Sequence, residues 1–174
     1  MELSDLIIGT DKQVKLQKGD VVFNQGDIEH TFYFVKSGML KATYVADDGS
    51  EFIKSFILSG DLIGSLTSAH MNIPCTFSLI CIKQCELVKI PFQILRQGSK
   101  SDLNLANELI ERLIQLAMKK EQREFEFLCM TAEERYLKML ETSPELIESV
   151  TQNDLAKYLG ITPVGLSRIK KRVT

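Results

Sequence analysis

The last 24 residues constrain the fold of this chain most, because they read as two short helices joined by a tight turn. Thr151 suits an N-cap, and Asp154, three positions later, suits the positive end of a helix. Gly160 favours the left-handed conformation that ends a helix. Thr162 and Pro163 favour an immediate restart, because Thr caps well and the first helical turn needs no N–H from Pro. The tail therefore predicts a helix-turn-helix, a motif that places its second helix in the DNA major groove.

The second predicted helix carries side chains suited to DNA. Leu166 and Ile169 share its inward face, so its polar and basic side chains point outward. Arg168 can donate two hydrogen bonds to guanine, Val164 can contact a thymine methyl, and lysines near the end suit phosphates. The predicted DNA-binding residues are Thr162, Val164, Ser167, Arg168, Lys170, Lys171 and Arg172. The competing interpretation is an ordinary amphipathic helical hairpin that caps the domain.

Charge is distributed unevenly along the chain. From Thr151 onward there are five basic residues and one acidic residue, whereas the whole chain has a net charge of −2. A basic tail on an acidic body is expected to approach DNA tail first. We therefore expect double-stranded DNA as the partner.

The bulk composition fits one core and a small appendage: the chain has 174 residues, 44% hydrophobic and 25% charged. No apolar run reaches about 18 residues, which predicts no membrane span. The first residues, Met1 to Asp5, lack the basic start and apolar core of a signal peptide. These features predict a cytoplasmic protein, in which the four cysteines are expected to be free thiols.

Short β-rich runs separated by glycines occupy the first hundred residues. The sequence Asp47-Asp-Gly-Ser50 between two of them is a strong hairpin-turn signal. Many short strands with turns every 8–12 residues or so predict an antiparallel barrel or jelly roll. The predicted strands are Val21–Phe23, Phe32–Val35, Leu40–Val45, Phe52–Leu58, Cys75–Ile82 and Glu86–Ile90.

A long helix is predicted to follow, from Ser101 to about Phe127, and Thr131 with Glu134 predicts a capping box on a shorter helix that ends at Thr142. Apolar residues recur along the long helix at steps of three and four, which is typical of a coiled-coil seam. This seam, predicted to be the dimer interface, consists of Leu103, Ala106, Ile110, Leu113 and Ala117.

A second apolar stripe on the long helix, made of Leu105, Leu109 and Leu116, is expected to pack on the barrel. A helix that is apolar on two faces needs two partners, here the barrel and a second chain. The alternative is a helix that is simply buried on its own barrel. The predicted domains are a barrel at 1–100, a dimerisation helix at 101–128 and a helix-turn-helix domain at 129–174.

The order of barrel, long helix and helix-turn-helix resembles the Crp/Fnr regulators, the superfamily of the cyclic-AMP receptor protein. The resemblance rests on Lys18-Gly-Asp20, Gln25-Gly-Asp27, Val35-Lys-Ser-Gly38, Gly60-Asp-Leu-Ile-Gly64, Glu133-Glu-Arg-Tyr136, Tyr158 to Pro163 and Leu166-Ser-Arg-Ile169. It implies an α+β fold with a cyclic-nucleotide-binding-like β jelly roll. It also implies a homodimeric transcription regulator that binds two half-sites about one helical turn apart. Arg168 lies where the family places its base-reading arginine.

The resemblance also locates an effector pocket at Gly64, Ser65, Cys75 and Thr76. Members that bind cyclic nucleotides follow the glycine with a glutamate and place an Arg-Ser or Arg-Thr pair against the phosphate. Here Ser65 and Cys75-Thr76 stand at those positions, so the bidentate grip of an arginine on the phosphate is missing. We therefore predict no tight binding of cyclic AMP or GMP, no cofactor, and an effector that remains an unknown small molecule.

The cysteines and histidines do not form a recognisable cofactor site. Cys75, Cys81 and Cys85 follow the spacing C-x5-C-x3-C, which matches no common zinc or cluster signature, and the two histidines are isolated. We expect buried structural thiols, with a redox switch at Cys75 as the alternative. No metal site, nucleophile–base pair or phosphate loop is recognised, so no enzyme is predicted.

Two further expectations follow from the tail. The chain stops at Thr174, directly after the second helix, whereas many Crp/Fnr members continue into a wing-like hairpin, so we expect fewer DNA-backbone contacts and a lower affinity. The alternative function is a small-molecule-binding or protein-interaction module that has lost sequence-specific DNA binding.

Overall fold

The computed structural model describes Leu3, Asp5 and residues 12–173. The signal-peptide expectation rests partly on Met1, Glu2 and Ser4, which lie outside the described residues. Thr174 lies outside them as well. None of the described helices is both long and apolar enough to cross a membrane.

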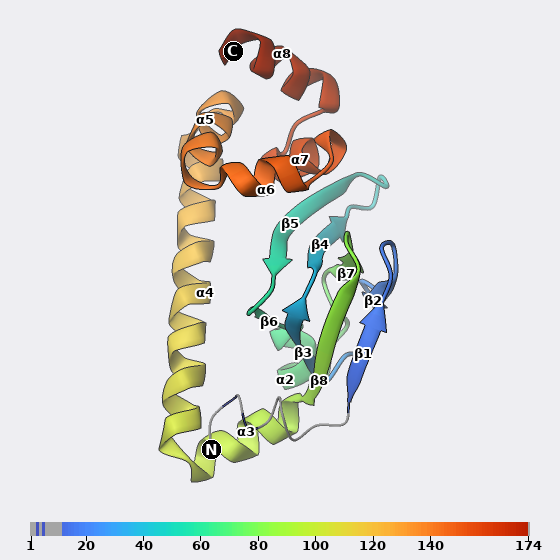
Figure 1. Ribbon diagram of the computed structural model, residues 1–174, viewed down its shortest axis with the longest axis vertical. Helices are drawn as coiled ribbons and strands as arrows, with labels where there is room; N and C mark the ends of the chain where they lie inside the picture. Colours follow the sequence, from blue (N-terminus) through green and yellow to red (C-terminus); the bar gives the residue numbers. More distant parts are fainter. Residues whose placement is uncertain (1–2, 4, 6–11, 174) are drawn as a thin grey trace.

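Two four-stranded antiparallel sheets form the N-terminal part of the molecule, as predicted (Figure 1). The first has the order β1 (Gln13–Leu16), β8 (Cys85–Pro91), β3 (Thr31–Ser37) and β6 (Leu62–Ile63). The second has the order β2 (Val21–Phe23), β7 (Ser78–Cys81), β4 (Met39–Val45) and β5 (Glu51–Leu58). The sequence pattern missed β1 and β6, which are only four and two residues long and too short for clear alternation.

Apolar side chains from both sheets fill the barrel interior. Leu40, Leu79 and Leu87 are fully buried there, and Cys75 lies among them. Each such side chain contributes about 1.5–3 kcal/mol relative to remaining exposed. The interior is therefore a packed core.

Gly38 makes the tight connection between β3 and β4. Its φ is +99°, and a Cβ at this position would lie 2.3 Å from the backbone oxygen of Gln84. Only a glycine allows the chain to turn this close to the start of β8.

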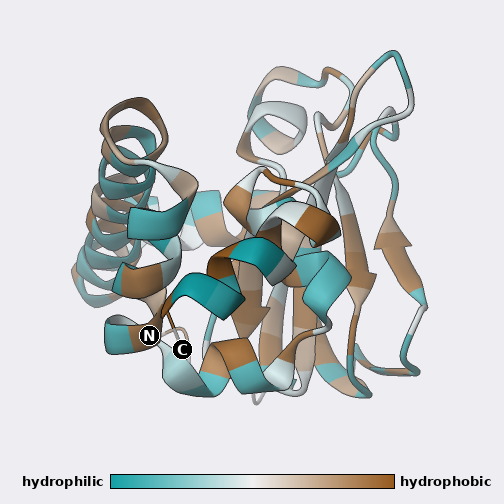
Figure 2. Ribbon diagram, turned by 90° about the horizontal axis from the view of Figure 1, so that it is seen from above, coloured by the Kyte–Doolittle hydropathy of each residue, from teal (hydrophilic) through white to brown (hydrophobic). Residues whose placement is uncertain are grey.

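Three helices follow or interrupt the sheets: α2 (Leu66–Met71), α3 (Phe92–Ser101) and α4 (Leu103–Cys129). The long helix begins two residues later than predicted, because the Asp102 side chain caps it by accepting hydrogen bonds from the backbone N–H groups of Asn104 and Leu105. The sequence missed α3, which starts directly after β8 without a side-chain cap. Seen from above, α4 stands to one side of the sheets, and hydrophobic and hydrophilic segments alternate along it (Figure 2).

Four short helices complete the chain: α5 (Ala132–Thr142), α6 (Pro144–Ser149), α7 (Gln152–Leu159) and α8 (Pro163–Val173). The predicted capping box of α5 is confirmed, since Thr131 and Glu134 bond each other's backbone N–H groups. A separate small core joins these helices, and it includes Tyr136, Met139, Leu155, Leu159, Leu166 and Ile169. The C-terminal helices therefore form a unit of their own beyond the end of α4 (Figure 1).

Candidate functional site

The turn between α7 and α8 is built from the caps that the sequence predicted. The Thr151 hydroxyl accepts a hydrogen bond from the Asp154 backbone N–H at 3.1 Å. Gly160 ends α7 with a φ of +70°. The Thr162 hydroxyl accepts from the Gly165 backbone N–H at 3.1 Å, which caps the start of α8. Local hydrogen bonds thus set the angle at which α8 leaves the turn.

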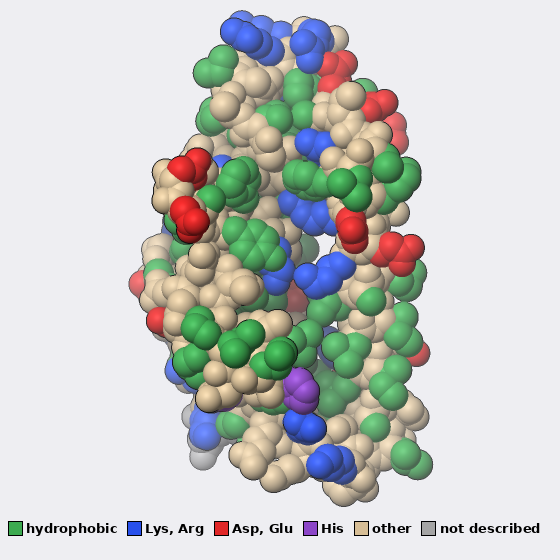
Figure 3. Space-filling model, turned by 180° about the vertical axis from the view of Figure 1, so that it is seen from behind, with side chains coloured by type: hydrophobic (Ala, Val, Ile, Leu, Met, Phe, Trp, Pro, Cys, Tyr) green, Lys and Arg blue, Asp and Glu red, His purple; other side chains and the backbone are tan. Residues whose placement is uncertain are grey.

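One face of α8 is exposed and carries four of the seven predicted DNA-binding residues. Val164, Ser167, Arg168 and Lys171 are exposed at helical spacing, while Leu166 and Ile169 are buried beneath them. Within the described part of the chain, no carboxylate pairs with Arg168 or Lys171. Lys and Arg side chains gather at this end of the molecule (Figure 3). The face can therefore offer its full positive charge to a partner.

Two of the predicted phosphate-binding residues turn toward α5 instead. The Arg172 guanidinium donates from Nε to the Glu133 carboxylate at 2.9 Å. The Lys170 ammonium lies 5.9 Å from the centre of the Tyr136 ring. Part of their positive charge is therefore used within the protein, which sequence spacing alone does not show.

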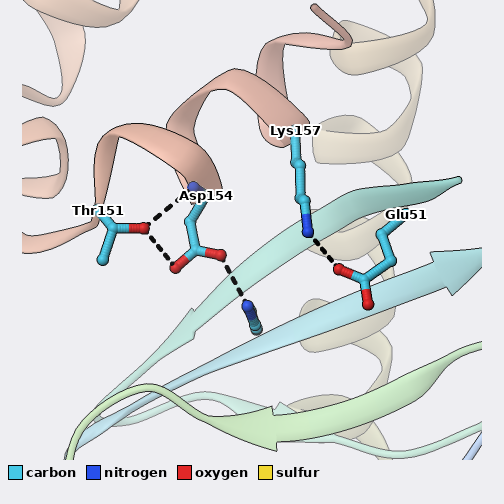
Figure 4. A network of polar contacts seen from close by, with 5 residues as sticks. Glu51, Thr151, Asp154 and Lys157 are labelled. Carbon is cyan, nitrogen blue, oxygen red and sulfur yellow. Dashed lines mark hydrogen bonds and ion pairs between the residues drawn. The ribbon is translucent and has the colours of Figure 1, made fainter. Parts of the chain in front are cut away.

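Ion pairs hold α7 on the outer face of the barrel. Lys41 of β4 donates to the Asp154 carboxylate at 2.7 Å, and both side chains are largely buried. Lys157 pairs with Glu51 of β5 one turn further along α7 (Figure 4). Asp154 also accepts a hydrogen bond from the Thr151 hydroxyl, so one carboxylate serves the cap and the barrel contact.

Two arginines that sequence reasoning missed connect α4, α5 and α7. Arg123 donates to the backbone oxygens of Ile53 and Tyr158 at 3.0 and 2.9 Å, and its guanidinium lies 3.9 Å from the Tyr158 ring centre. Arg135 donates to the backbone oxygens of Met130 and Leu159 at 2.6 and 2.8 Å. Charge-assisted bonds to otherwise unpaired helix-end carbonyls stabilise such junctions. The only sequence signal was the position of Arg135 within Glu133-Glu-Arg-Tyr136.

The predicted dimer seam lies open on α4. Leu103, Ile110 and Leu113 are 80%, 52% and 50% exposed, Ala117 is exposed and Ala106 is half-buried. The second predicted stripe does pack inward at Leu105 and Leu109, which join a cluster with β3, β8 and α3. Leu116 remains exposed instead, because the upper part of α4 stands away from that cluster.

Of the four predicted effector residues, one lines the cavity between the barrel and the helices. Gly64 lines a cavity of about 530 Å³ between the barrel, α2, α3 and α4. Ser65 is buried as the N-cap of α2, Cys75 is buried in the barrel core and Thr76 is exposed. Capping thus occupies the Ser65 side chain and core packing occupies that of Cys75, whereas the Thr76 side chain is open to solvent.

The buried cysteines have the environment of structural thiols. Burial, reinforced by the neighbouring Cys85, raises the pKa of Cys81 to about 12, so this thiol stays protonated near neutral pH. Cys75 is buried as well, and Cys129 is the exposed one. Among the residues that the structure describes, no three His, Cys, Asp or Glu side chains gather as metal ligands.

Comparisons with known proteins agree with this geometry. Residues 13–102 match the cyclic nucleotide-binding domain. Over 98% of its length the chain is 28% identical to an anaerobic regulatory protein of Haemophilus influenzae, covering 70% of that protein. It is 27% identical to the regulatory protein HlyX of Actinobacillus pleuropneumoniae, again over 98% of the chain and 75% of the relative. The fold matches FixK2 of Bradyrhizobium japonicum with a TM-score of 0.79 and 17% identity, covering 92% of this chain and 83% of that one.

Proposed function

We propose that this chain acts as a homodimer that binds an inverted repeat in DNA. It belongs to the cyclic nucleotide-binding domain family and is a DNA-binding transcription regulator of the Crp/Fnr type. The observation that carries this proposal is the exposed face of α8, on which Arg168 and Lys171 have no carboxylate partner among the described residues. A helix presented in this way fits the major groove.

The roles on this face follow from side-chain chemistry. Arg168 offers two donors to guanine and specifies a base, whereas Lys171 neutralises a phosphate and contributes salt-dependent affinity. Val164 and Ser167 add a methyl contact and a hydroxyl at the same face. Thr162 caps the start of the helix. The remaining basic residues, Lys170 and Arg172, add to the positive electrostatic potential beside the exposed face of α8.

A second copy is needed to bring two recognition helices to two half-sites. The exposed seam of α4 supports this, because large apolar patches on a protein surface mark interaction sites. Two seams packed in parallel would place the two α8 helices at the same end of the dimer. We place this regulator in the cytoplasm, where its DNA is, and assign it no enzymatic reaction.

Tight binding of cyclic AMP or GMP is not part of the proposal. Cys75 stands where an arginine would hold the cyclic phosphate, and its side chain is buried in the barrel core. A charged phosphate placed there would lose its hydration without gaining a charged partner.

Selection of bound sequences from random duplex DNA by ligand-free protein tests the proposal. We expect an enriched inverted repeat with half-sites about one helical turn apart. Arg168→Ala should relax one base position and cost about 1–3 kcal/mol there, whereas Lys171→Ala should mainly lower the salt dependence. Lys83→Ala removes an exposed charge between β7 and β8, outside the C-terminal helices, and serves as the control.

An Arg168→Ala protein that selects the same repeat would contradict the role of Arg168. Absent or salt-insensitive DNA binding, with and without cell metabolites, would instead favour a small-molecule-binding or protein-interaction module.

A further inference from the structure

A cavity of about 530 Å³ lies outside the barrel core, between the barrel and the helices. Its wall comes from β3, β5, β6, α2, α3 and α4, and most of the lining is apolar. Figure 3 shows a hollow on this side of the molecule, with hydrophobic side chains inside it and cationic ones at its margin. The volume fits a small organic molecule.

One end of this cavity has a flat aromatic wall. The Phe32 and Phe92 rings stack with their centres 5.5 Å apart, and the His70 ring meets Phe92 edge-on at 6.3 Å. Gly64 makes room for this wall, because a Cβ at its position would lie 2.8 Å from the Phe32 ring. An apolar or aromatic group can therefore lie flat against this end.

The Arg96 side chain lies beside the aromatic wall without a carboxylate partner among the described residues. The Arg96 guanidinium lies with Nη1 3.2 Å from Nδ1 of His70, and both residues line the cavity. Within the described part of the chain, neither residue has an ion-pair partner, and neither does Lys119 at the other end.

The remaining charged side chains of the lining already have partners. Arg112 pairs with Glu108 at 3.2 Å, and the Asp61 carboxylate accepts a hydrogen bond from the Leu58 backbone N–H at 2.8 Å. Among the described residues, no carboxylate therefore neutralises Arg96 at this cavity. A ligand carboxylate could take the donor that Arg96 now directs to His70.

We propose that this cavity binds an amphipathic organic carboxylate, with its apolar body on the Phe32–Phe92 wall and its carboxylate on Arg96 and His70. The site shares Gly64 with the pocket expected from the resemblance to cyclic nucleotide binders, but Ser65, Cys75 and Thr76 do not line it. The inference deepens the proposed function, because it names the chemical class of the effector.

The cavity also adjoins the seam proposed for the dimer. Ala106, Ile110 and Leu113 belong both to the seam and to the cavity wall. A molecule in the cavity therefore contacts the helix that a second copy would cover. Its binding free energy can bias how the two α4 helices pack.

Isothermal titration calorimetry on the full chain, without DNA, tests the site with four probes. Two are carboxylates, 2-naphthoate and decanoate, and two are their uncharged alcohol counterparts. We expect at least one carboxylate to bind, with the matching alcohol roughly tenfold or more weaker, since a charge-assisted bond is lost. Arg96→Gln should weaken the carboxylate by a similar factor. Lys100→Gln removes the same charge from the same helix outside the cavity and should change nothing.

Three results would overturn the proposal: no carboxylate binding up to millimolar concentration, equal binding of carboxylate and alcohol, or equal effects of the two variants. The comparison of carboxylate with alcohol on the unmutated protein holds even if Arg96→Gln fails to fold. Because no DNA is present, a failure here leaves the selected inverted repeat intact. A missing repeat would instead count against the proposed function.

Discussion

At the scale of single residues, Lys54 shows how position changes chemistry. Its ammonium lies 3.8 Å from the centre of the buried Phe77 ring. No carboxylate among the described residues pairs with it. Burial, and then the charge of Lys120, lowers the pKa of Lys54 to about 8. Keeping this amine charged inside the fold therefore costs stability at neutral pH.

Replacing Lys54 with methionine should remove this cost. The folded-state pKa lies below the unfolded value, so the unfolded chain binds more protons between about pH 8 and 10.5 and the natural protein gains stability as pH rises through that window. Below about pH 8 the penalty is fully present. Lys54→Met should thus raise the free energy of unfolding by about 1–2 kcal/mol at pH 7, after allowing for the lost cation–π contact, and by less at pH 10.

Urea unfolding at both pH values measures this difference. Lys83→Met, at an exposed lysine, is the matched control and should shift stability little at either pH. A Lys54→Met protein that is less stable than the natural one at pH 7 would show that the lysine contributes more than its burial costs.

At the scale of elements, the attachment of α7 to the barrel joins two units with separate cores. Two ion pairs of different exposure make this attachment: Lys41–Asp154, with side chains 18% and 11% exposed, and Lys157–Glu51, with 25% and 46%. Buried pairs lose much when one partner is removed, whereas exposed pairs contribute little. The two contacts therefore allow a comparison within one interface.

Lys41→Met should lower the free energy of unfolding by about 1–3 kcal/mol, because Asp154 is left buried without its cation. Glu51→Gln should cost less than about 1 kcal/mol, because its pair is more exposed. Chemical denaturation of both variants, at low and high salt, measures the two losses. Equal losses would mean that burial does not set the strength of this interface.

At the scale of the whole molecule, α4 links the sensor-like barrel to the C-terminal helices and leaves one apolar side uncovered. Leu105 is buried against the barrel, whereas Leu113, at the edge of the cavity, remains half exposed. An uncovered apolar stripe on a 27-residue helix is costly in water and favours association.

Leu113→Glu together with Ile110→Glu should therefore yield a folded monomer, because charges at the seam would be desolvated and repel each other in a dimer. Sedimentation velocity at micromolar concentration measures the association state, and DNA affinity for the inverted repeat should fall with it. Gln122→Glu, on α4 away from the seam, is the control. Dimers that persist in the double variant would place the interface elsewhere.

The sequence by itself determined the features that depend on neighbours within about four positions. The capping box at Thr131 and Glu134, the stop at Gly160 and the restart at Thr162 were all predictable, since these bonds form inside one helical turn. Alternating apolar residues likewise predicted the central strands. Very short strands such as β6 carry too few residues for that pattern.

The tertiary structure alone decided which distant side chains meet. Lys41 and Asp154 are 113 positions apart, and Arg172 pairs with Glu133 across 39. Arg96 reaches His70 only because α2 and α3 converge beside the same cavity. Such contacts follow from how whole elements pack, which no local spacing encodes. Packing likewise decides that Gly64 lines the cavity whereas Cys75 lies in the barrel core.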